Sequence, residues 1–213
     1  LAIGTDDGLI QISEDGGDNW TRYDTFPGIP ELTRVSRLTW SRHSEGRLYV
    51  AFDGHKDNDF RPFLLVSEDY GATWSPLHAG MPEFGSTRVI REHPRNPDFL
   101  AAGTEFGLFL SIDRGASWTE VENLPTVAVH DVVFHPREND IVIGTHGRGI
   151  WVLDDATIIE EMASAQDGAL LASVRPATQI REFNRGRGSQ GARYYRAPNP
   201  PRGAILSMYL DLP

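Results

Sequence analysis

One pattern, Ser-x-Asp-x-Gly-x-x-Trp, occurs three times in this chain of 213 residues. Four fixed positions that recur in this way indicate an internal repeat, and a repeat constrains the fold more strongly than composition does. The repeated serines lie 54 and then 44 residues apart, which sets the length of the unit. The twelve residues are Ser13, Asp15, Gly17, Trp20, Ser67, Asp69, Gly71, Trp74, Ser111, Asp113, Gly115 and Trp118.

The pattern is typical of a tight turn between two strands. Ser and Asp side chains accept hydrogen bonds from backbone amides that follow them, which closes a turn locally. Glycine permits the positive φ that other residues resist. Tryptophan then begins the outgoing strand and offers a large apolar surface for packing. We therefore interpret all twelve residues as structural rather than catalytic.

Two further elements recur upstream of these turns. A Gly-Thr loop at 4–8, 103–107 and 144–149 follows a short apolar run, and a further strand recurs upstream at 35–40, 89–92 and 129–134. The second unit carries a longer loop at 53–62 instead. Each unit thus contains four short strands, here called A to D, with the Asp-containing turn between C and D. Four strands in a repeat of this length are typical of a β-propeller blade.

The predicted fold is all-β: a partial β-propeller of about three and a half four-stranded blades at residues 1–155. The chain begins at strand B of the first blade, and Asp154-Asp155 replaces the repeated turn in the fourth. Ring closure usually takes at least four blades, and an open arc exposes unpaired strand edges. We therefore expect a longer polypeptide, or binding to the remainder of the propeller.

Residues 156–168 are predicted to form a helix that closes the propeller. Ile158, Ile159 and Met162 are expected to face inward. Glu160 and Glu161 are expected to face outward.

Residues 169–213 are predicted to form a basic arm and the start of a following β-sandwich domain, whose first strand we place at 204–210. The Arg-Gly stretch at 185–188 is interpreted as a flexible loop that crosses an acidic surface, with polyanion binding as the alternative. The change of charge sign between this arm and the acidic blades suggests two structural units, or one unit with an appended arm.

Composition excludes several functional classes. The chain has no cysteine, which removes disulfides, thiolate metal sites and thiol nucleophiles. No apolar run is as long as a membrane span requires. The net charge of −10 argues against a generally basic nucleic-acid binder.

In a blade of this kind the B–C and D–A loops lie on one face of the disc, and the Asp-containing turns lie on the other. His130, Arg88 and Ser36 align at the start of strand A and are expected near the channel mouth on the first face. The candidate binding residues on this rim are Asp53, His55, Asp57, Asp59, Glu105, His130, His146 and Arg148.

Two kinds of chemistry are open at this rim. Asp53, Asp57 and Asp59 alternate along one loop and could hold calcium, with a solvated acidic loop as the alternative. A glycosidase needs two carboxyl groups about 5–10 Å apart, and the rim offers several carboxylates. No phosphate loop, nucleophile elbow or His-Glu-x-x-His helix is present. We assign no catalytic residue and expect no other cofactor.

The three turns resemble the Asp-boxes of bacterial neuraminidase-type repeats, found in sialidases, xyloglucanases, photosystem assembly factors and sortilin-type receptors. The strings at 49–55, 103–108 and 144–151 resemble large bacterial sortilin-like or glycosyl-hydrolase-like proteins in which a β-sandwich follows the propeller. The segment 197–204 is similar to the start of that next domain. The resemblance implies a secreted or periplasmic protein. Sialidase chemistry is disfavoured, because no tyrosine of residues 1–155 falls in a rim loop.

The leading hypothesis is a non-enzymatic β-propeller scaffold that binds a protein, a peptide or a glycan at its loop-rich face, because every strong motif is structural. The first alternative is a secreted polysaccharide hydrolase, xyloglucanase-like, whose site uses rim carboxylates such as Asp53. The second is an assembly subunit of a larger complex. One fold hosts many functions, so the fold alone does not rank these alternatives.

Overall fold

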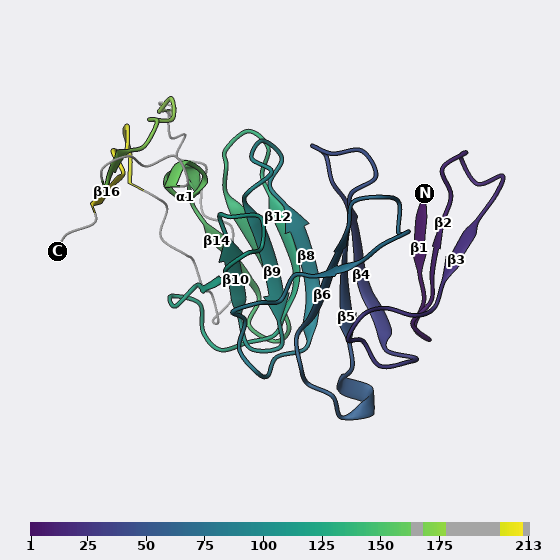
Figure 1. Cartoon of the computed structure of the whole chain (residues 1–213). Coiled ribbons are helices and arrows are strands. Elements are labelled where there is room, and N and C mark those ends of the chain that lie inside the picture. Colours follow the sequence, from purple (N-terminus) through teal and green to yellow (C-terminus); the bar gives the residue numbers. More distant parts are fainter. Residues whose placement is uncertain (163–167, 178–200, 211–213) are drawn as a thin grey trace, which may run out of the picture.

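The computed structural model describes residues 1–162, 168–177 and 201–210. Within these residues four antiparallel sheets follow one another across the molecule, from the purple N-terminal sheet to the green one beside α1 (Figure 1). Blade one contains β1 (Ala2–Gly4), β2 (Ile10–Ile12) and β3 (Thr21–Tyr23), and blade two contains β4 (Arg34–Trp40), β5 (Leu48–Asp53), the 3-10 turn η1 (His55–Asp57), β6 (Phe63–Ser67) and β7 (Ser75–Pro76). Blade three contains β8 (Thr87–Glu92), β9 (Leu100–Thr104), β10 (Leu108–Ser111) and β11 (Thr119–Glu120), and blade four contains β12 (Val129–Phe134), β13 (Ile141–Thr145) and β14 (Ile150–Leu153).

The strands of each blade pair in chain order, so strand A lies at one edge of its sheet and strand D at the other. The A strands β4, β8 and β12 lie side by side, and the sheets fan out from them (Figure 1). Within the described residues, blade one has strands B to D and blade four has strands A to C. The prediction of an all-β, partial propeller with four-stranded blades is confirmed.

The three repeated turns share one set of hydrogen bonds. The Ser hydroxyl donates to Asp Oδ1 at 2.7–2.9 Å and accepts from the Gly N–H at 2.7–2.8 Å. The same Asp accepts from the backbone N–H four residues later, at 2.8–2.9 Å, and from the side chain of that residue. That residue is Asn19, Thr73 or Ser117, a recurring polar position that the four-residue pattern omits.

The repeated turn also joins neighbouring blades. Gly115 has a φ of +87°, and a Cβ there would lie 2.6 Å from the side chain of Leu77 in blade two. Gly71 in blade two meets Ile12 of blade one in the same way, at 2.7 Å. The indole N–H of Trp118 donates to the carbonyl oxygen of Leu77 at 2.8 Å. Glycine is therefore needed for close approach between blades as well as for its φ.

Three apolar cores lie along the arc, one at each joint between blades. They are formed by alternate side chains of adjacent sheets, which face each other across the joint. Buried members of the three cores, in chain order, are Ile12 and Phe52, then Leu64 and Ile90, then Leu108 and Ile143.

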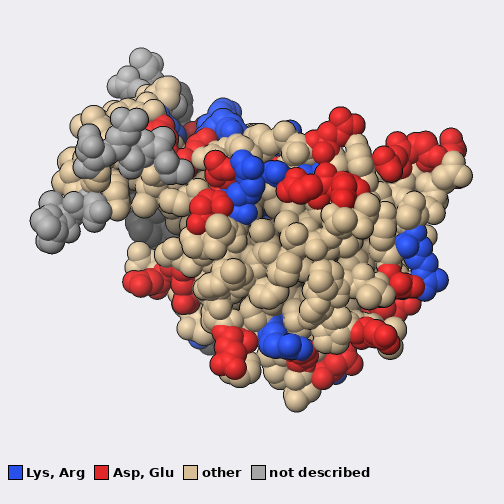
Figure 2. Space-filling view, viewed as in Figure 1, with Lys and Arg blue, Asp and Glu red and all other residues tan. Residues whose placement is uncertain are grey.

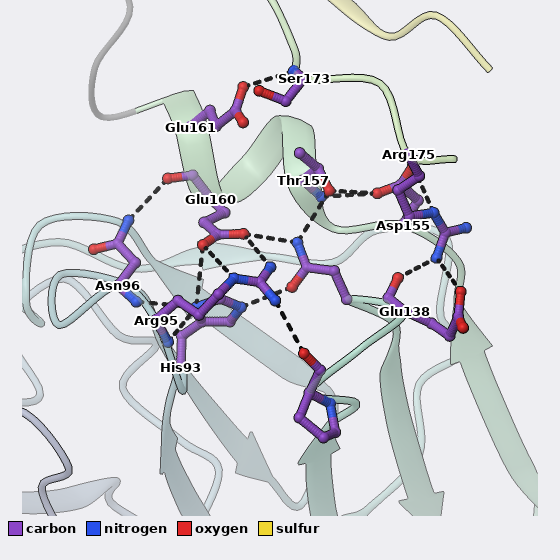
Figure 3. Close-up of polar contacts among 12 residues, drawn as sticks. His93, Arg95, Asn96, Glu138, Asp155, Thr157, Glu160, Glu161, Ser173 and Arg175 are labelled. Carbon is purple, nitrogen blue, oxygen red and sulfur yellow. Dashed lines mark hydrogen bonds and ion pairs between the residues drawn. The ribbon is translucent and has the colours of Figure 1, made fainter. Parts of the chain in front are cut away.

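The helix α1 (Thr157–Met162) is held against blades three and four by a charged residue (Figure 3). Glu160 accepts hydrogen bonds from Arg95 at 2.7 Å and from the Asn139 amide at 2.8 Å, and its side chain is 15% exposed. The outward placement of Glu160 is therefore wrong. No residue of this short helix is fully buried, because the helix lies over polar A–B turns. Ion pairs therefore hold the helix in place, together with Ile159, which packs on the blade core.

After the helix, β15 (Ala169–Leu171) pairs with β16 (Met208–Leu210) in a two-stranded sheet. The strand predicted at 204–210 is therefore formed only in its second half. Residues 163–167 of the predicted helix, the stretch at 185–188 and residues 197–200 lie outside the described residues. The arm and the following β-sandwich stay predictions. None of the described helices has the length and apolar character that a bilayer crossing needs.

Candidate binding face

Blades two and three meet around one guanidinium. Arg88, near the start of β8, forms ion pairs with Asp53 at the end of β5 and with Glu105 in the B–C loop of blade three. Its Nε also donates to Glu105 Oε2 at 3.1 Å. His55 Nδ1 lies 2.8 Å from Asp53 Oδ2. These four residues form the Arg88 cluster, which contains three of the predicted binding residues.

Burial divides the Arg88 cluster into a floor and an exposed edge. The Asp53 side chain has no exposed surface and that of Arg88 is 13% exposed, whereas those of Glu105 and His55 are 35% and 37% exposed. A buried carboxylate without partners would be costly, and the guanidinium and imidazole offset that cost. Asp53 thus positions Arg88 and His55, while Glu105 and His55 are partly exposed to solvent.

Two histidines from blade four stack beside this cluster. The rings of His130 on β12 and His146 in the B–C loop have centroids 5.2 Å apart and planes 23° apart. Partial burial of the ring, with the positive charges of Arg88 and His146, lowers the pKa of His130 below its usual value. The strand β12, which carries His130, packs against β8, which carries Arg88. We therefore treat the histidine pair and the Arg88 cluster as one candidate site, here called the rim site.

Within the described residues, three predicted binding residues make no side-chain hydrogen bond or ion pair with the rim site. Asp59 pairs with Arg61 at 2.5 Å, and hydrogen bonds from Arg61 lower the pKa of Asp59. Asp57 is exposed on η1. Arg148 is exposed in the B–C loop of blade four, where its carbonyl oxygen accepts a hydrogen bond from the Trp151 indole at 3.1 Å. The structure therefore brings together five of the eight predicted residues.

Calcium at Asp53, Asp57 and Asp59 stays a prediction. The Asp53 carboxylate is directed to Arg88 and His55. Within the part of the chain that the structure describes, no group of three or more His, Asp or Glu side chains is arranged to hold a metal ion.

The carboxyl groups of the rim site are not free of one another. A glycosidase needs one carboxyl group that reaches the glycosidic oxygen and a second that acts at the sugar. Asp53 and Glu105 both pair with Arg88, and Asp53 is closed off from solvent. The site thus presents an imidazole pair, one accessible carboxylate and a guanidinium, which are hydrogen-bonding and charged groups suited to a polar ligand.

Arg88 is the central residue that sequence reasoning did not include among the binding residues. Strand A carries a β-bulge in blades two, three and four. The extra residue of the bulge is Ser36 in blade two, Arg88 in blade three and His130 in blade four. Bulges re-aim a side chain and are frequent beside functional sites. The available signal was the alignment of the repeats, which puts a polar residue at this strand position in three blades.

No family model matches the sequence. The chain is 30% identical over 156 residues to the oligoxyloglucan-reducing end-specific xyloglucanase of Emericella nidulans, and 30% identical over 155 residues to the probable enzyme of that name from Neosartorya fischeri. The matches cover 65% and 66% of this chain. They cover 19% of each relative, so the chain spans about a fifth of the length of the curated relatives it matches.

Solved structures share the fold. "YCF48 bound to D1 peptide" matches with a TM-score of 0.53 and 15% identity, over 72% of this chain and 47% of that one. The GH74 xyloglucanase from Xanthomonas campestris matches with a TM-score of 0.52 and 19% identity, over 67% and 23% of the two chains. The GH74 enzyme from Niastella koreensis matches with a TM-score of 0.53 and 18% identity, over 68% of this chain and 25% of that one. These neighbours are β-propeller proteins, and at such identities the likeness concerns the fold alone. The chain is an arc of a β-propeller.

Proposed function

We propose that this chain is a non-enzymatic β-propeller scaffold that binds a partner protein, as an extended peptide, at the rim site. One observation carries the proposal. Asp53 from blade two and Glu105 from blade three both pair with Arg88, yet these two carboxylates share one guanidinium and that of Asp53 is fully buried. A rim of polar loops around a channel mouth also offers an extended ligand contacts from several blades at once.

The fold comparisons support this form of ligand. The matched YCF48 structure is described as bound to a peptide, so a propeller of similar fold accommodates one. A glycan is the second ligand class for the same groups, because imidazole, carboxylate and guanidinium also hydrogen-bond to sugar hydroxyls.

A polysaccharide hydrolase is the alternative function, and a specific observation favours it. Both curated relatives are xyloglucanases with 30% identity to this chain. In this alternative, Glu105 would supply one carboxyl group and a residue elsewhere in the protein the other. An assembly subunit of a larger complex is the third possibility and would use the same rim site.

We also propose that the three repeated turns are Asp-boxes of a sortilin-like or glycosyl-hydrolase-like repeat protein, secreted or periplasmic, whose further blades complete the ring. The shared hydrogen bonds of the turns support the first part of this proposal.

Two assays on the purified chain test the proposed function. A phage-displayed library of random peptides is selected on the immobilised chain, and the best peptides are measured by fluorescence anisotropy. We expect His146→Ala and Glu105→Gln to weaken binding about tenfold, as the loss of one charge-assisted contact would. The matched control Glu14→Gln, which is exposed in the repeated turn of blade one and therefore belongs to the opposite face, should leave binding unchanged.

Xyloglucan oligosaccharides serve as the second probe. The scaffold hypothesis expects no new reducing ends after long incubation. Hydrolysis that Glu105→Gln abolishes would replace the proposed function with the alternative. Selected peptides that bind the rim variants as tightly as the wild type would place binding elsewhere and refute the rim assignment.

A further inference from the structure

Two arginines and one aspartate meet on the three A strands, beyond the rim site. Arg37 lies on β4, Arg91 on β8 and Asp131 on β12. Both guanidinium groups donate to the same carboxylate oxygen, Asp131 Oδ1, at 3.3 Å from Arg37 and 2.9 Å from Arg91. Because the A strands lie side by side where the sheets converge, these side chains line the axial edge of the arc.

The positive charges in this group exceed the negative charge. Two guanidinium groups share one carboxylate, so one positive charge has no counterpart within the trio. The bond to Asp131 is the one hydrogen bond that the Arg37 side chain makes within the described residues, and its Nε is buried without a hydrogen-bond partner. Burial and the positive charge of Arg91 lower the pKa of Arg37, and Asp131 offsets this only in part.

The trio is open to a ligand. The side chains of Arg37, Arg91 and Asp131 are 31%, 26% and 48% exposed. They also sit in a protein with a net charge of −10. Acidic groups are spread widely over the face that Figure 2 shows, among fewer basic ones. A local positive charge on an otherwise acidic protein attracts an anionic group to that one position, while the rest of the surface repels anions.

We propose that Arg37 and Arg91 form a receptor for a carboxylate of the bound peptide, and that Asp131 occupies this receptor in the free protein. Asp131 itself shows that both guanidinium groups can reach one carboxylate, and planar guanidinium groups suit that partner. The inference rests on the proposed function, since His130 of the rim site directly precedes Asp131 in the chain. A peptide at the rim would extend an acidic residue or its C-terminal carboxylate along the axial edge.

Three synthetic heptapeptides test the receptor against the full chain by fluorescence anisotropy. The first alternates Gly with three Glu and has both ends blocked. The second replaces Glu with Gln, and the third is the Gln peptide with a free C-terminal carboxylate. We expect the first or the third to bind at least about tenfold more tightly than the second. The member that does so identifies the source of the carboxylate, and equal binding of all three overturns the proposal.

Charge-matched variants distinguish a ligand-binding role of Arg37 and Arg91 from a purely structural one. Arg37→Gln and Arg91→Gln should each weaken binding of the preferred peptide about tenfold, whereas Arg137→Gln, 80% exposed in an A–B turn, should not. Asp131→Asn should tighten binding, because it removes the resident competitor. Weaker binding by Asp131→Asn overturns the proposal.

The two proposals fail differently. Library peptides that lose affinity in His146→Ala but not in Arg37→Gln or Arg91→Gln would leave the rim site standing and refute the receptor.

Discussion

Glu160 is expected to hold α1 on the blades, and its replacement by glutamine measures how strongly. The substitution keeps the shape of the side chain and removes the charge that Arg95 and Asn139 contact. A hydrogen bond to a charged group contributes about 1.5–3 kcal/mol. Arg95 is 45% exposed, so its pair contributes at most about 1 kcal/mol, whereas the Asn139 side is buried. We therefore expect Glu160→Gln to lower the free energy of unfolding by about 2 kcal/mol.

Denaturant unfolding at pH 7, followed by tryptophan fluorescence, measures this difference, and thermal unfolding should show a fall of about 4–8 °C. Glu122→Gln, the same chemical change at an exposed position, is the control. Equal stabilities of Glu160→Gln and the wild type would refute the reasoning, because the contacts in Figure 3 would then contribute nothing measurable.

The same variant has a pH signature. Burial alone would raise the pKa of Glu160, but hydrogen bonds from Arg95 and the positive charges nearby outweigh it and lower the pKa. A lowered folded-state pKa gives stability that is complete above the ordinary value of 4.5 and is lost as pH falls through the folded-state pKa. The difference between wild type and Glu160→Gln should therefore shrink at acid pH. A difference as large at pH 3 as at pH 7 would contradict the charge-based explanation.

Three further predictions follow from the turns and the rim. Gly115→Ala should lower the free energy of unfolding by about 2–4 kcal/mol, from backbone strain and overpacking, in denaturant titrations. Gly80→Ala, which has a positive φ but no neighbour within 4 Å, should lose about 1 kcal/mol, and equal losses would contradict the blade-contact argument. Although burial opposes them, hydrogen bonds lower the pKa of Asp113, so stability should fall as pH drops below about 4; Asp113→Asn should flatten that fall, and an unchanged slope would refute it. His146→Gln should raise the pKa of His130 in an NMR titration, because it removes a positive neighbour, and an unmoved pKa would show that the rings do not interact.

The blades were predictable from the sequence because the repeated turns are local. The Ser13, Asp15 and Gly17 contacts span at most four residues, so their pattern is legible along the chain. The strand runs between them are short and apolar, and the repeat supplies their order. The same locality identified the B–C loops as the candidate binding face.

Residue contacts across blades were not predictable in this way. Arg88 reaches partners 35 and 17 residues away in opposite directions along the chain, and no spacing rule links them. Glu160 was expected at the surface because a lone glutamate on a short helix usually is. The Glu160 side chain points inward only because the helix lies over polar A–B turns.

The sequence by itself determined the type of sheet, the order of strands and the tight turns, because these depend on neighbours a few residues apart. The tertiary structure decided which charged groups meet. The arrangement of Arg37, Arg91 and Asp131 exists only because three strands, each separated by about a blade of sequence, lie side by side at the axial edge. Ion pairs across that edge depend on distance in space, which is set by how the blades pack and not by spacing along the chain.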